Sequence, residues 1–189
     1  MFAMADSAFL ARHGATEWSV SGQHTSRTDL PLLPDGEDVA RELAVRLGGT
    51  TFAEVLTSPL LRARRTAELA GFPDAEVCDD LVEWGYGDYE GRTTAQIREE
   101  VPGWTIWTHP TPGGEPADAV AARCDRVVQR IRAAAGPVLV FAHGHVLRAL
   151  AARWLGLPVR EGRLFRLDTA TLSELGYERE TPVLLRWNS

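Results

Sequence analysis

Short apolar runs alternate with amphipathic segments along most of the chain, and each pattern predicts one kind of element. Residues 137–141, a run without a charged position, are typical of a strand that is buried on both faces of a sheet. Farther upstream, Val39, Leu43 and Leu47 recur every fourth residue, which predicts a helix that ends at the Gly48-Gly49 pair.

The same criteria predict the remaining elements. Strands are expected at residues 8–11, 53–56, 76–78 and 137–141, and two or three more around residues 163–167, 172–177 and 183–187. Helices are expected at residues 35–47, 58–69, 95–101, 116–131 and 146–155. Ser58 can cap the second helix, and Pro116 suits the first turn of the fourth. The stretch 84–115 is rich in Gly, Pro and Trp and is mostly loop by composition.

This alternation predicts a single three-layer α/β/α domain over residues 1–189, with a mostly parallel central sheet and helices on both faces. In such sheets, ligands bind beyond the carboxyl ends of the strands. Reactive side chains follow three of the predicted strands, at residues 12–14, 58–62 and 143–145. We expect these three segments to converge on one site.

Composition and charge narrow the class of protein. The 189 residues carry a formal charge of −6 and are 44% apolar, which fits one globular domain and argues against a general binder of nucleic acid or anionic membranes. Cys78 and Cys124 form no disulfide framework. The first ten residues lack the regions of a signal peptide, and no apolar run has membrane length, so a cytoplasmic location is expected. The oligomeric state stays open, with a homodimer as one candidate.

The tripeptide Arg12-His13-Gly14 follows the first predicted strand. A neutral imidazole is a good nucleophile towards phosphorus and can split a slow hydrolysis into two easier steps. Arg12 would hold a phosphoryl group with its fork of N–H donors, and Gly14 would let the backbone approach a ligand closely. Alone, the tripeptide is a weak signal, because a single histidine is more often a structural residue.

Two further segments carry matching chemistry. Arg62 lies in the first turn of its predicted helix and can point back over the strand end, where the helix N-terminus also favours an anion. In the stretch 83–91, a carboxyl group beside aromatic rings could donate a proton to a leaving alkoxide. Spacing alone leaves open whether Glu83, Asp88 or Glu90 does so.

His143 follows the buried run at 137–141 and would lie opposite His13 if the two strands are neighbours. A protonated His143 would hold phosphate better than a neutral one. With His145 it forms a His-x-His pair, which can begin a metal site, but nothing nearby in the sequence supplies the further ligands. We therefore predict no metal and no other cofactor.

Four ordered motifs resemble the histidine phosphatase superfamily, which includes the cofactor-dependent phosphoglycerate mutases. They are residues 12–18 (RHGATEW), 58–63 (SPLLRA), 83–91 (EWGYGDYEG) and 141–144 (FAHG). The resemblance implies a phosphohistidine at His13 and phosphoryl contacts from Arg12, Arg62 and His143. It also implies that Glu83 is the general acid that later activates water.

A narrower likeness points to the branch that contains bacterial acid phosphatases and the fungal sedoheptulose-1,7-bisphosphatase. It rests on residues 21–25, 83–91, 106–108, 114–115 and 143–145. The expected substrates are small phosphorylated metabolites, namely sugar phosphates or bisphosphates. Substrate binding is expected at Ser19, which stands where mutases usually have an asparagine, and at His24, Thr25 and Trp84. A second phosphate would require another cation, for which Arg27 and Arg92 are the candidates.

Two alternatives belong to other classes of function. A cofactor-dependent mutase would pass the phosphoryl group to a second sugar acid, but the short segment between Gly91 and Glu115 favours an open site and hence hydrolysis. A non-catalytic domain that only binds phosphorylated ligands would be marked by loss of the nucleophile or the acid. Both His13 and Glu83 are present.

Overall fold

A six-stranded sheet in the order β3-β2-β4-β1-β5-β6 runs through the computed structural model, which describes residues 7–189. The strands are β1 (Ala8–Arg12), β2 (Glu54–Thr57), β3 (Glu76–Val77), β4 (Val138–Ala142), β5 (Leu172–Glu178) and β6 (Thr181–Arg186). The pairs β1–β4, β4–β2 and β2–β3 are parallel, whereas β5 is antiparallel to both β1 and β6. The predicted, mostly parallel sheet is therefore confirmed.

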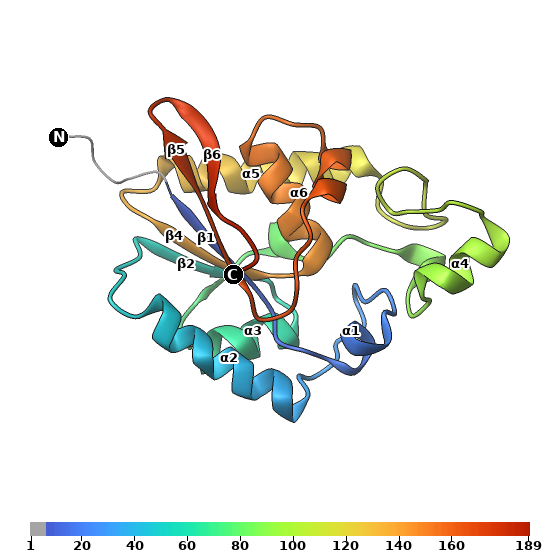
Figure 1. The fold of residues 1–189 in the computed structure, drawn as a ribbon, viewed down its shortest axis with the longest axis horizontal. Helices are drawn as coiled ribbons and strands as arrows, with labels where there is room; N and C mark the ends of the chain where they lie inside the picture. Colours follow the sequence, from blue (N-terminus) through green and yellow to red (C-terminus); the bar gives the residue numbers. More distant parts are fainter. Residues whose placement is uncertain (1–6) are drawn as a thin grey trace.

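Helices cover both faces of this sheet, as predicted. They are α1 (Glu17–Ser21), α2 (Pro34–Leu47), α3 (Leu61–Leu69), α4 (Thr94–Glu100), α5 (Ala117–Ala133) and α6 (Gly144–Trp154), with 3₁₀ turns η1 (Asp79–Leu81), η2 (Gly87–Tyr89) and η3 (Val159–Leu164). Figure 1 shows α2 and α3 on one side of the sheet and α5 and α6 on the other. Every residue of β4 is buried, because Leu139 and Phe141 pack towards α2 and α3 while Val138 and Val140 pack towards α5 and α6.

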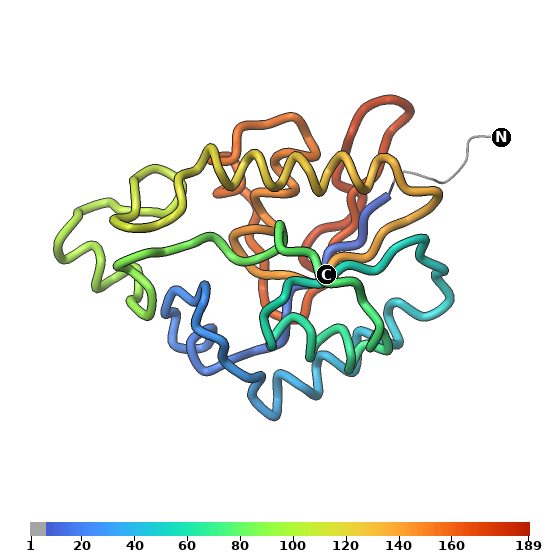
Figure 2. The backbone as a smooth tube through the Cα atoms, turned by 180° about the vertical axis from the view of Figure 1, so that it is seen from behind, coloured from blue at the N-terminus to red at the C-terminus, as the bar shows by residue number. Residues whose placement is uncertain are grey.

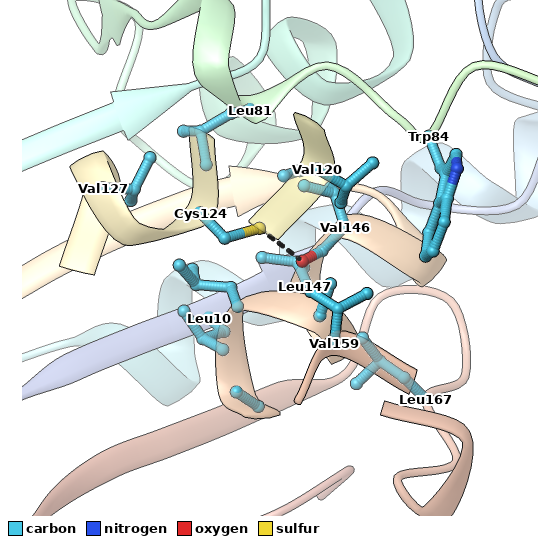
Figure 3. Close-up of a cluster of buried hydrophobic side chains, with 14 of the residues drawn as sticks. Leu10, Leu81, Trp84, Val120, Cys124, Val127, Val146, Leu147, Val159 and Leu167 are labelled. Atoms are coloured by element: carbon cyan, nitrogen blue, oxygen red, sulfur yellow. Dashed lines mark hydrogen bonds between the residues drawn. The ribbon is translucent and has the colours of Figure 1, made fainter. Parts of the chain in front are cut away.

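The larger core lies between the sheet, α5 and α6. Figure 3 shows Cys124 of α5 packed among aliphatic side chains, with its Sγ atom 4.0 Å from the carbonyl oxygen of Val146. Burial raises the pKa of the Cys124 thiol to about 12. A thiol that stays protonated is a poor nucleophile, so Cys124 contributes packing to the fold rather than reactivity.

Three local predictions differ from the structure. The strand expected at residues 163–167 is wrong, since the chain forms η3 and then an irregular segment there. Ser58 does not cap α3, which begins at Leu61 without a side-chain cap. The short helix α1 was not predicted; it starts at a capping box in which Thr16 and Ser19 each bind the other's backbone N–H.

The segment from residue 84 to residue 116 extends past the carboxyl ends of the strands before the chain returns in α5 (Figure 2). It has little regular structure apart from η2 and α4, yet its aromatic rings are buried. Trp104 packs edge-on against Tyr89, and Trp107 packs edge-on against Trp84. These contacts hold an irregular segment against the part of the molecule where ligands are expected.

Candidate active site

The predicted convergence of strand ends is present in the structure. Because β1 and β4 pair in parallel with Arg12 opposite Ala142, His13 and His143 both follow the sheet at the same edge. The backbone N–H of His13 donates to the Ala142 carbonyl at 3.0 Å, and the two imidazole ring centroids lie 5.2 Å apart. Ser58, just after β2, is joined to the same edge by a backbone bond to Phe141.

His13 is held as a neutral base. Its Nδ1 atom lies 2.7 Å from the Gly14 carbonyl oxygen, which can only accept, so Nδ1 carries the proton and Nε2 keeps a lone pair. The side chain is 4% exposed. Burial and, after it, the positive charge of Arg12 lower the pKa of His13 well below its ordinary value. The imidazole is therefore uncharged at neutral pH, which is the form that can attack an electrophile.

Gly14 has a different structural reason from the one the sequence suggested. A Cβ atom at this position would lie 2.4 Å from the carbonyl oxygen of Gly36, at the start of α2. The missing side chain of Gly14 thus makes room for the backbone of Gly36. It does not make room for a ligand, which was the reason that the sequence suggested. Its N–H donates to the Thr66 hydroxyl of α3 at 3.0 Å, which fixes the turn that carries His13.

Arg62 organises the loop that follows α1. Its guanidinium is fully buried and donates to the carbonyl oxygens of Thr25, Ser26 and Thr28 at 3.0–3.1 Å. Glu90 binds the same loop through the N–H groups of Ser26 and Thr28. Glu90, one of the three candidate acids, is therefore engaged in holding this loop.

His143 lies beneath the site and is fully buried. Its Nε2 atom is 2.7 Å from the Ser58 hydroxyl oxygen. Burial and then the charge of Arg62 lower the pKa of His143 well below its ordinary value. The protonated form of His143 is therefore disfavoured, because a third buried positive charge beside Arg12 and Arg62 is unfavourable.

Three buried nitrogen atoms lack a hydrogen-bond partner within the part of the chain that the structure describes. They are Nε of Arg12, Nε of Arg62 and Nδ1 of His143. Buried polar groups are usually paired, because leaving one unpaired costs about 1–3 kcal/mol. All three atoms belong to the residues expected to bind a phosphoryl group. We refer to Arg12, His13, Arg62 and His143 as the phosphoryl centre.

Glu83 is joined to the start of α6. Its Oε1 atom accepts hydrogen bonds from the N–H groups of Trp84 and Val146, both at 2.8 Å, and its Oε2 atom accepts one from His145 at 2.9 Å. A helix N-terminus presents such unpaired N–H groups, so a carboxylate there has a fixed position. Oε2 accepts one bond where Oε1 accepts two, which leaves Oε2 the oxygen with more room for a further hydrogen bond.

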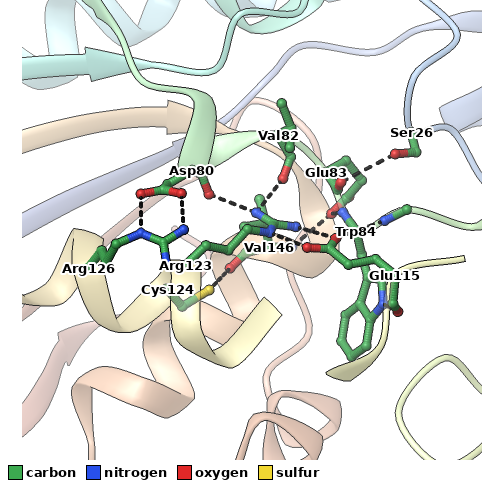
Figure 4. A network of polar contacts seen from close by, with 11 residues as sticks. Ser26, Asp80, Val82, Glu83, Trp84, Glu115, Arg123, Cys124, Arg126 and Val146 are labelled. Carbon is green, nitrogen blue, oxygen red and sulfur yellow. Dashed lines mark hydrogen bonds and ion pairs between the residues drawn. The ribbon is translucent and has the colours of Figure 1, made fainter. Parts of the chain in front are cut away.

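A buried arginine of α5 supports the chain that leads to Glu83. Figure 4 shows the Arg123 guanidinium between the carbonyl oxygens of Asp80 and Val82, each 2.7 Å from its Nη1 atom. Its Nε atom pairs with Glu115 at 2.8 Å. These bonds tie α5 and the end of the 84–116 segment to the residues immediately before Glu83.

A pocket of about 270 Å³ opens over Arg12, His13 and Glu83. Arg62 and His143 are fully buried and do not line it. It is lined by Arg12, His13, Ser19, Gly22, Gln23, His24, Thr25, Glu83, Tyr86, Thr94, Gly144, His145, Arg148 and Leu167. The predicted residues Ser19, His24 and Thr25 therefore lie together with the nucleophile and Glu83. Ser19 also serves the start of α1, since its hydroxyl donates to the Thr16 carbonyl.

Three predicted substrate-binding residues lie outside this pocket. Trp84 is buried in the core, and its indole N–H donates to the Glu115 carbonyl. Arg92 turns towards α4, where it pairs with Glu100 at 2.6 Å. Arg27 is exposed and does not line the pocket. The loop that carries Arg27 directs its carbonyl oxygens, rather than this side chain, towards Arg62.

Six side chains that line the pocket were not predicted as site residues, namely Gln23, Tyr86, Thr94, His145, Arg148 and Leu167. Tyr86 and His145 form a pair, with the phenol oxygen 2.5 Å from Nδ1 of His145, and His24 stacks on His145 with a centroid separation of 6.0 Å. Arg148 lies three residues after His145 on α6. That spacing puts both side chains on one face of a helix and was the available signal for Arg148.

Two other properties concern the described residues as a whole. Between residues 7 and 189, no three His, Cys, Asp or Glu side chains are grouped closely enough to hold a metal ion. In the same range, none of the helices is long and apolar enough to cross a membrane.

The fold and the site together define an α/β enzyme with a histidine, two arginines and a carboxylic acid beyond the carboxyl ends of its parallel strands. The chain belongs to the histidine phosphatase superfamily (branch 1), which it matches over residues 8–189. The predicted histidine phosphatase, a hydrolase of phosphoric monoesters, is thereby confirmed.

Named relatives agree with this assignment. The chain is 42% identical to an acid phosphatase of Mycobacterium tuberculosis, over 89% of this chain and 85% of that protein. It is 38% identical to a sedoheptulose 1,7-bisphosphatase of Saccharomyces cerevisiae, over 80% and 68% of the two chains. The solved structure of a Mycobacterium tuberculosis open reading frame product has a TM-score of 0.93 and 38% identity, with 97% of each chain covered. The narrower likeness expected from the motifs is confirmed.

Proposed function

We propose that this enzyme hydrolyses small phosphorylated metabolites, sugar phosphates or bisphosphates, through a phosphohistidine at His13. One observation carries the proposal, namely the three unpaired buried nitrogens of Arg12, Arg62 and His143 around a neutral His13. N–H groups that lack a partner favour a ligand rich in acceptor oxygens, and a phosphoryl group is such a ligand. The acid phosphatase and the sugar bisphosphatase among the relatives support the substrate class.

In the first step, the Nε2 lone pair of His13 forms a bond to phosphorus while the bond from phosphorus to the leaving oxygen breaks. Glu83, in its acid form, passes its proton to that oxygen, so the product leaves as an alcohol. Nε-H of Arg12 and of Arg62 donate to the phosphoryl oxygens. A neutral His143 that carries its proton on Nδ1 does the same, while its Nε2 accepts the hydrogen bond of Ser58.

In the second step, Glu83 takes a proton from water as the water oxygen attacks phosphorus. The bond between phosphorus and Nε2 breaks, inorganic phosphate forms, and His13 returns to its neutral state. Glu83 ends the cycle protonated, as it began, so no other proton donor is needed.

A trapping experiment tests the nucleophile. Rapid quench of the enzyme with labelled aryl phosphate is expected to give a protein adduct that is labile in acid and stable in base, as a phosphoramidate is. His13→Ala should form no adduct and lose turnover by about 10⁴-fold or more, as expected for removal of a nucleophile. The matched control is His109→Asn, outside the pocket, which should keep the adduct. Burst turnover without an adduct on His13 would overturn the proposal.

Substrate class is tested by phosphate release from sugar phosphates, sugar bisphosphates and phosphoglycerates. The proposal expects release from the sugar esters and no interconversion of phosphoglycerates. Transfer of phosphate between phosphoglycerates at a rate above hydrolysis would favour the mutase instead. The cytoplasmic location and the homodimer stay predictions, which cell fractionation and light scattering of the purified protein check.

A further inference from the structure

The pocket is lined by an arginine that the proposed mechanism does not use. Arg148 of α6 lines the same pocket as Arg12 and Glu83. We refer to Arg148, together with Trp107 and Gly162 on which it rests, as the outer wall. Among these residues the sequence motifs mark Trp107, within residues 106–108, but neither Arg148 nor Gly162. The candidates for a second cation, Arg27 and Arg92, lie elsewhere.

Arg148 is held in one orientation by three contacts. Its Nε atom donates to the Gly162 carbonyl at 3.1 Å, and its Nη2 atom donates to the Arg163 carbonyl at 3.3 Å. The guanidinium carbon lies 4.8 Å from the centroid of the Trp107 ring, in cation–π geometry. Such a side chain loses little rotamer entropy when a ligand binds, so it is prepared to contact one.

Gly162 makes this arrangement sterically possible. A Cβ atom there would lie 2.6 Å from the Trp107 ring and 3.0 Å from the Arg148 carbonyl oxygen. The absence of a side chain lets η3 pack against the indole while its carbonyl accepts from Arg148. The outer wall is thus built from three separate parts of the chain, namely the 84–116 segment, α6 and η3.

The charge of Arg148 is not neutralised inside the protein. Its described partners are neutral carbonyls and an aromatic ring, and none of the ion pairs formed within residues 7–189 includes it. Glu83 is the one carboxylate among the residues that line the pocket, against the two cations Arg12 and Arg148. A half-buried cation without a counter-charge is costly to a fold and favours binding of an anion.

We propose that Arg148 binds the second phosphate of a sugar bisphosphate whose first phosphate occupies the phosphoryl centre. This inference rests on the proposed function and specifies its substrate class: phosphomonoesters that carry another phosphate are preferred over simple monoesters. The Nη1 atom of Arg148 makes no hydrogen bond among the described residues, so its N–H donors, with the second hydrogen of Nη2, are available to the oxygens of a terminal phosphate.

The test measures specificity rather than activity alone. Values of kcat/KM are determined for fructose 1,6-bisphosphate and for p-nitrophenyl phosphate, and their ratio is compared between proteins. Arg148→Gln is expected to lower the ratio by about tenfold or more, the effect of losing one charge-assisted contact. Arg92→Gln and Arg27→Gln, which remove the same charge outside the pocket, should leave the ratio unchanged. Equal losses on both substrates in Arg148→Gln would overturn the inference.

Two further experiments test whether Arg148→Gln acts by removing a contact to the second phosphate, rather than by impaired folding or by loss of a contact to a carboxylate. Arg148→Lys keeps the charge and the aliphatic stem over Trp107, so it should fold normally and recover part of the ratio. A second substrate pair is 3-phosphoglycerate, a phosphomonoester that carries a carboxylate, and glycerol 3-phosphate, which carries none. A fall in specificity for 3-phosphoglycerate with none for the bisphosphate would show that Arg148 serves a carboxylate and overturn the second-phosphate assignment.

Binding without turnover distinguishes this inference from the proposed function. In the His13→Ala background, calorimetry compares fructose 1,6-bisphosphate with fructose 1-phosphate. Adding Arg148→Gln should weaken binding of the bisphosphate about tenfold and that of the monophosphate less. If the unmodified enzyme hydrolyses neither ester, the proposed function fails, whereas the calorimetric comparison still decides the role of Arg148; equal weakening would refute it.

Discussion

In the phosphoryl centre, three buried nitrogens have no partner among the described residues, whereas in the outer wall the Arg148 guanidinium rests on two carbonyls and an indole ring. Carbonyl groups hold arginines in both regions, but the Nε atoms of Arg12 and Arg62 are unpaired, whereas Nε of Arg148 donates to Gly162. The difference separates two tasks. In our proposals, the unpaired donors bind a phosphoryl group, and the fixed cation of Arg148 selects among the molecules that carry one.

The two regions also differ in how the chain builds them. The centre is formed where neighbouring parallel strands end, so the sheet register places His13 beside His143. The outer wall is formed by segments that no strand pairing holds in register. Its geometry depends on Gly162, where a side chain would clash with the indole ring of Trp107. A substitution in the centre should therefore change the chemical step, while one in the wall should change which substrate is used.

Among changes that leave the nucleophile in place, the largest effect is expected at Glu83. Glu83→Gln removes the proton that the leaving oxygen needs but keeps an acceptor for the N–H groups of α6, so turnover should fall by about 10²–10⁴. Glu90→Gln and Asp88→Asn are the matched controls and should cost clearly less, since Glu90 holds the loop of Arg62. Steady-state kinetics with an aryl phosphate and with a poorer leaving group measure the loss, which should be greater for the poorer one. A larger loss at Asp88 or Glu90 would reassign the acid.

A smaller effect is expected on stability as the pH falls. Burial lowers the pKa of His13 and His143 in the centre, and of His24 and His145 beside them. At pH values above about 6.5, histidines are neutral in the folded and unfolded chain alike. Below that value the unfolded chain binds more protons than the folded chain, because the pKa of the histidines is lower in the folded chain. The free energy of unfolding should therefore decrease as the pH is lowered.

Each histidine contributes at most about 1.4 kcal/mol per pH unit until its folded pKa is reached. Urea unfolding at pH 7.5, 6.5 and 5.5 measures the slope. His13→Gln should flatten the slope more than His24→Gln, because the pKa of His13 is lowered further by burial and by Arg12. Constant stability between pH 7.5 and 5.5 would show that these histidines are not buried in neutral form.

The smallest effect is expected from removal of metal ions. The centre and the outer wall build positive charge from arginines, so prolonged treatment with EDTA should leave the rate unchanged on both monophosphates and bisphosphates. Phosphate release before and after dialysis measures this. Loss of activity that zinc or magnesium restores would contradict the predicted independence of metal, and a loss confined to bisphosphates would assign the ion to the outer wall.

The sheet, the long helices that cover it and the members of the phosphoryl centre could all be predicted from the amino-acid sequence. Apolar runs predicted β1, β2 and β4, and helical spacing predicted α2 and α5, because these patterns repeat with the period of the element that they form. The residues of the centre follow directly after strands. Strand ends in a parallel sheet meet at one edge, so a local motif there is enough to predict a shared site.

Only the tertiary structure decided which side chains surround the substrate beyond that edge. Arg27, Arg92 and Trp84 were as plausible from the sequence as Arg148, yet a bond to Glu100 turns Arg92 away and core packing buries Trp84. The expected strand at 163–167 failed for the same reason, since η3 is held by contacts with α6 and Trp107. In irregular segments, the direction of a side chain depends on contacts with residues far along the chain rather than on a repeating period. A local sequence pattern does not reveal such contacts.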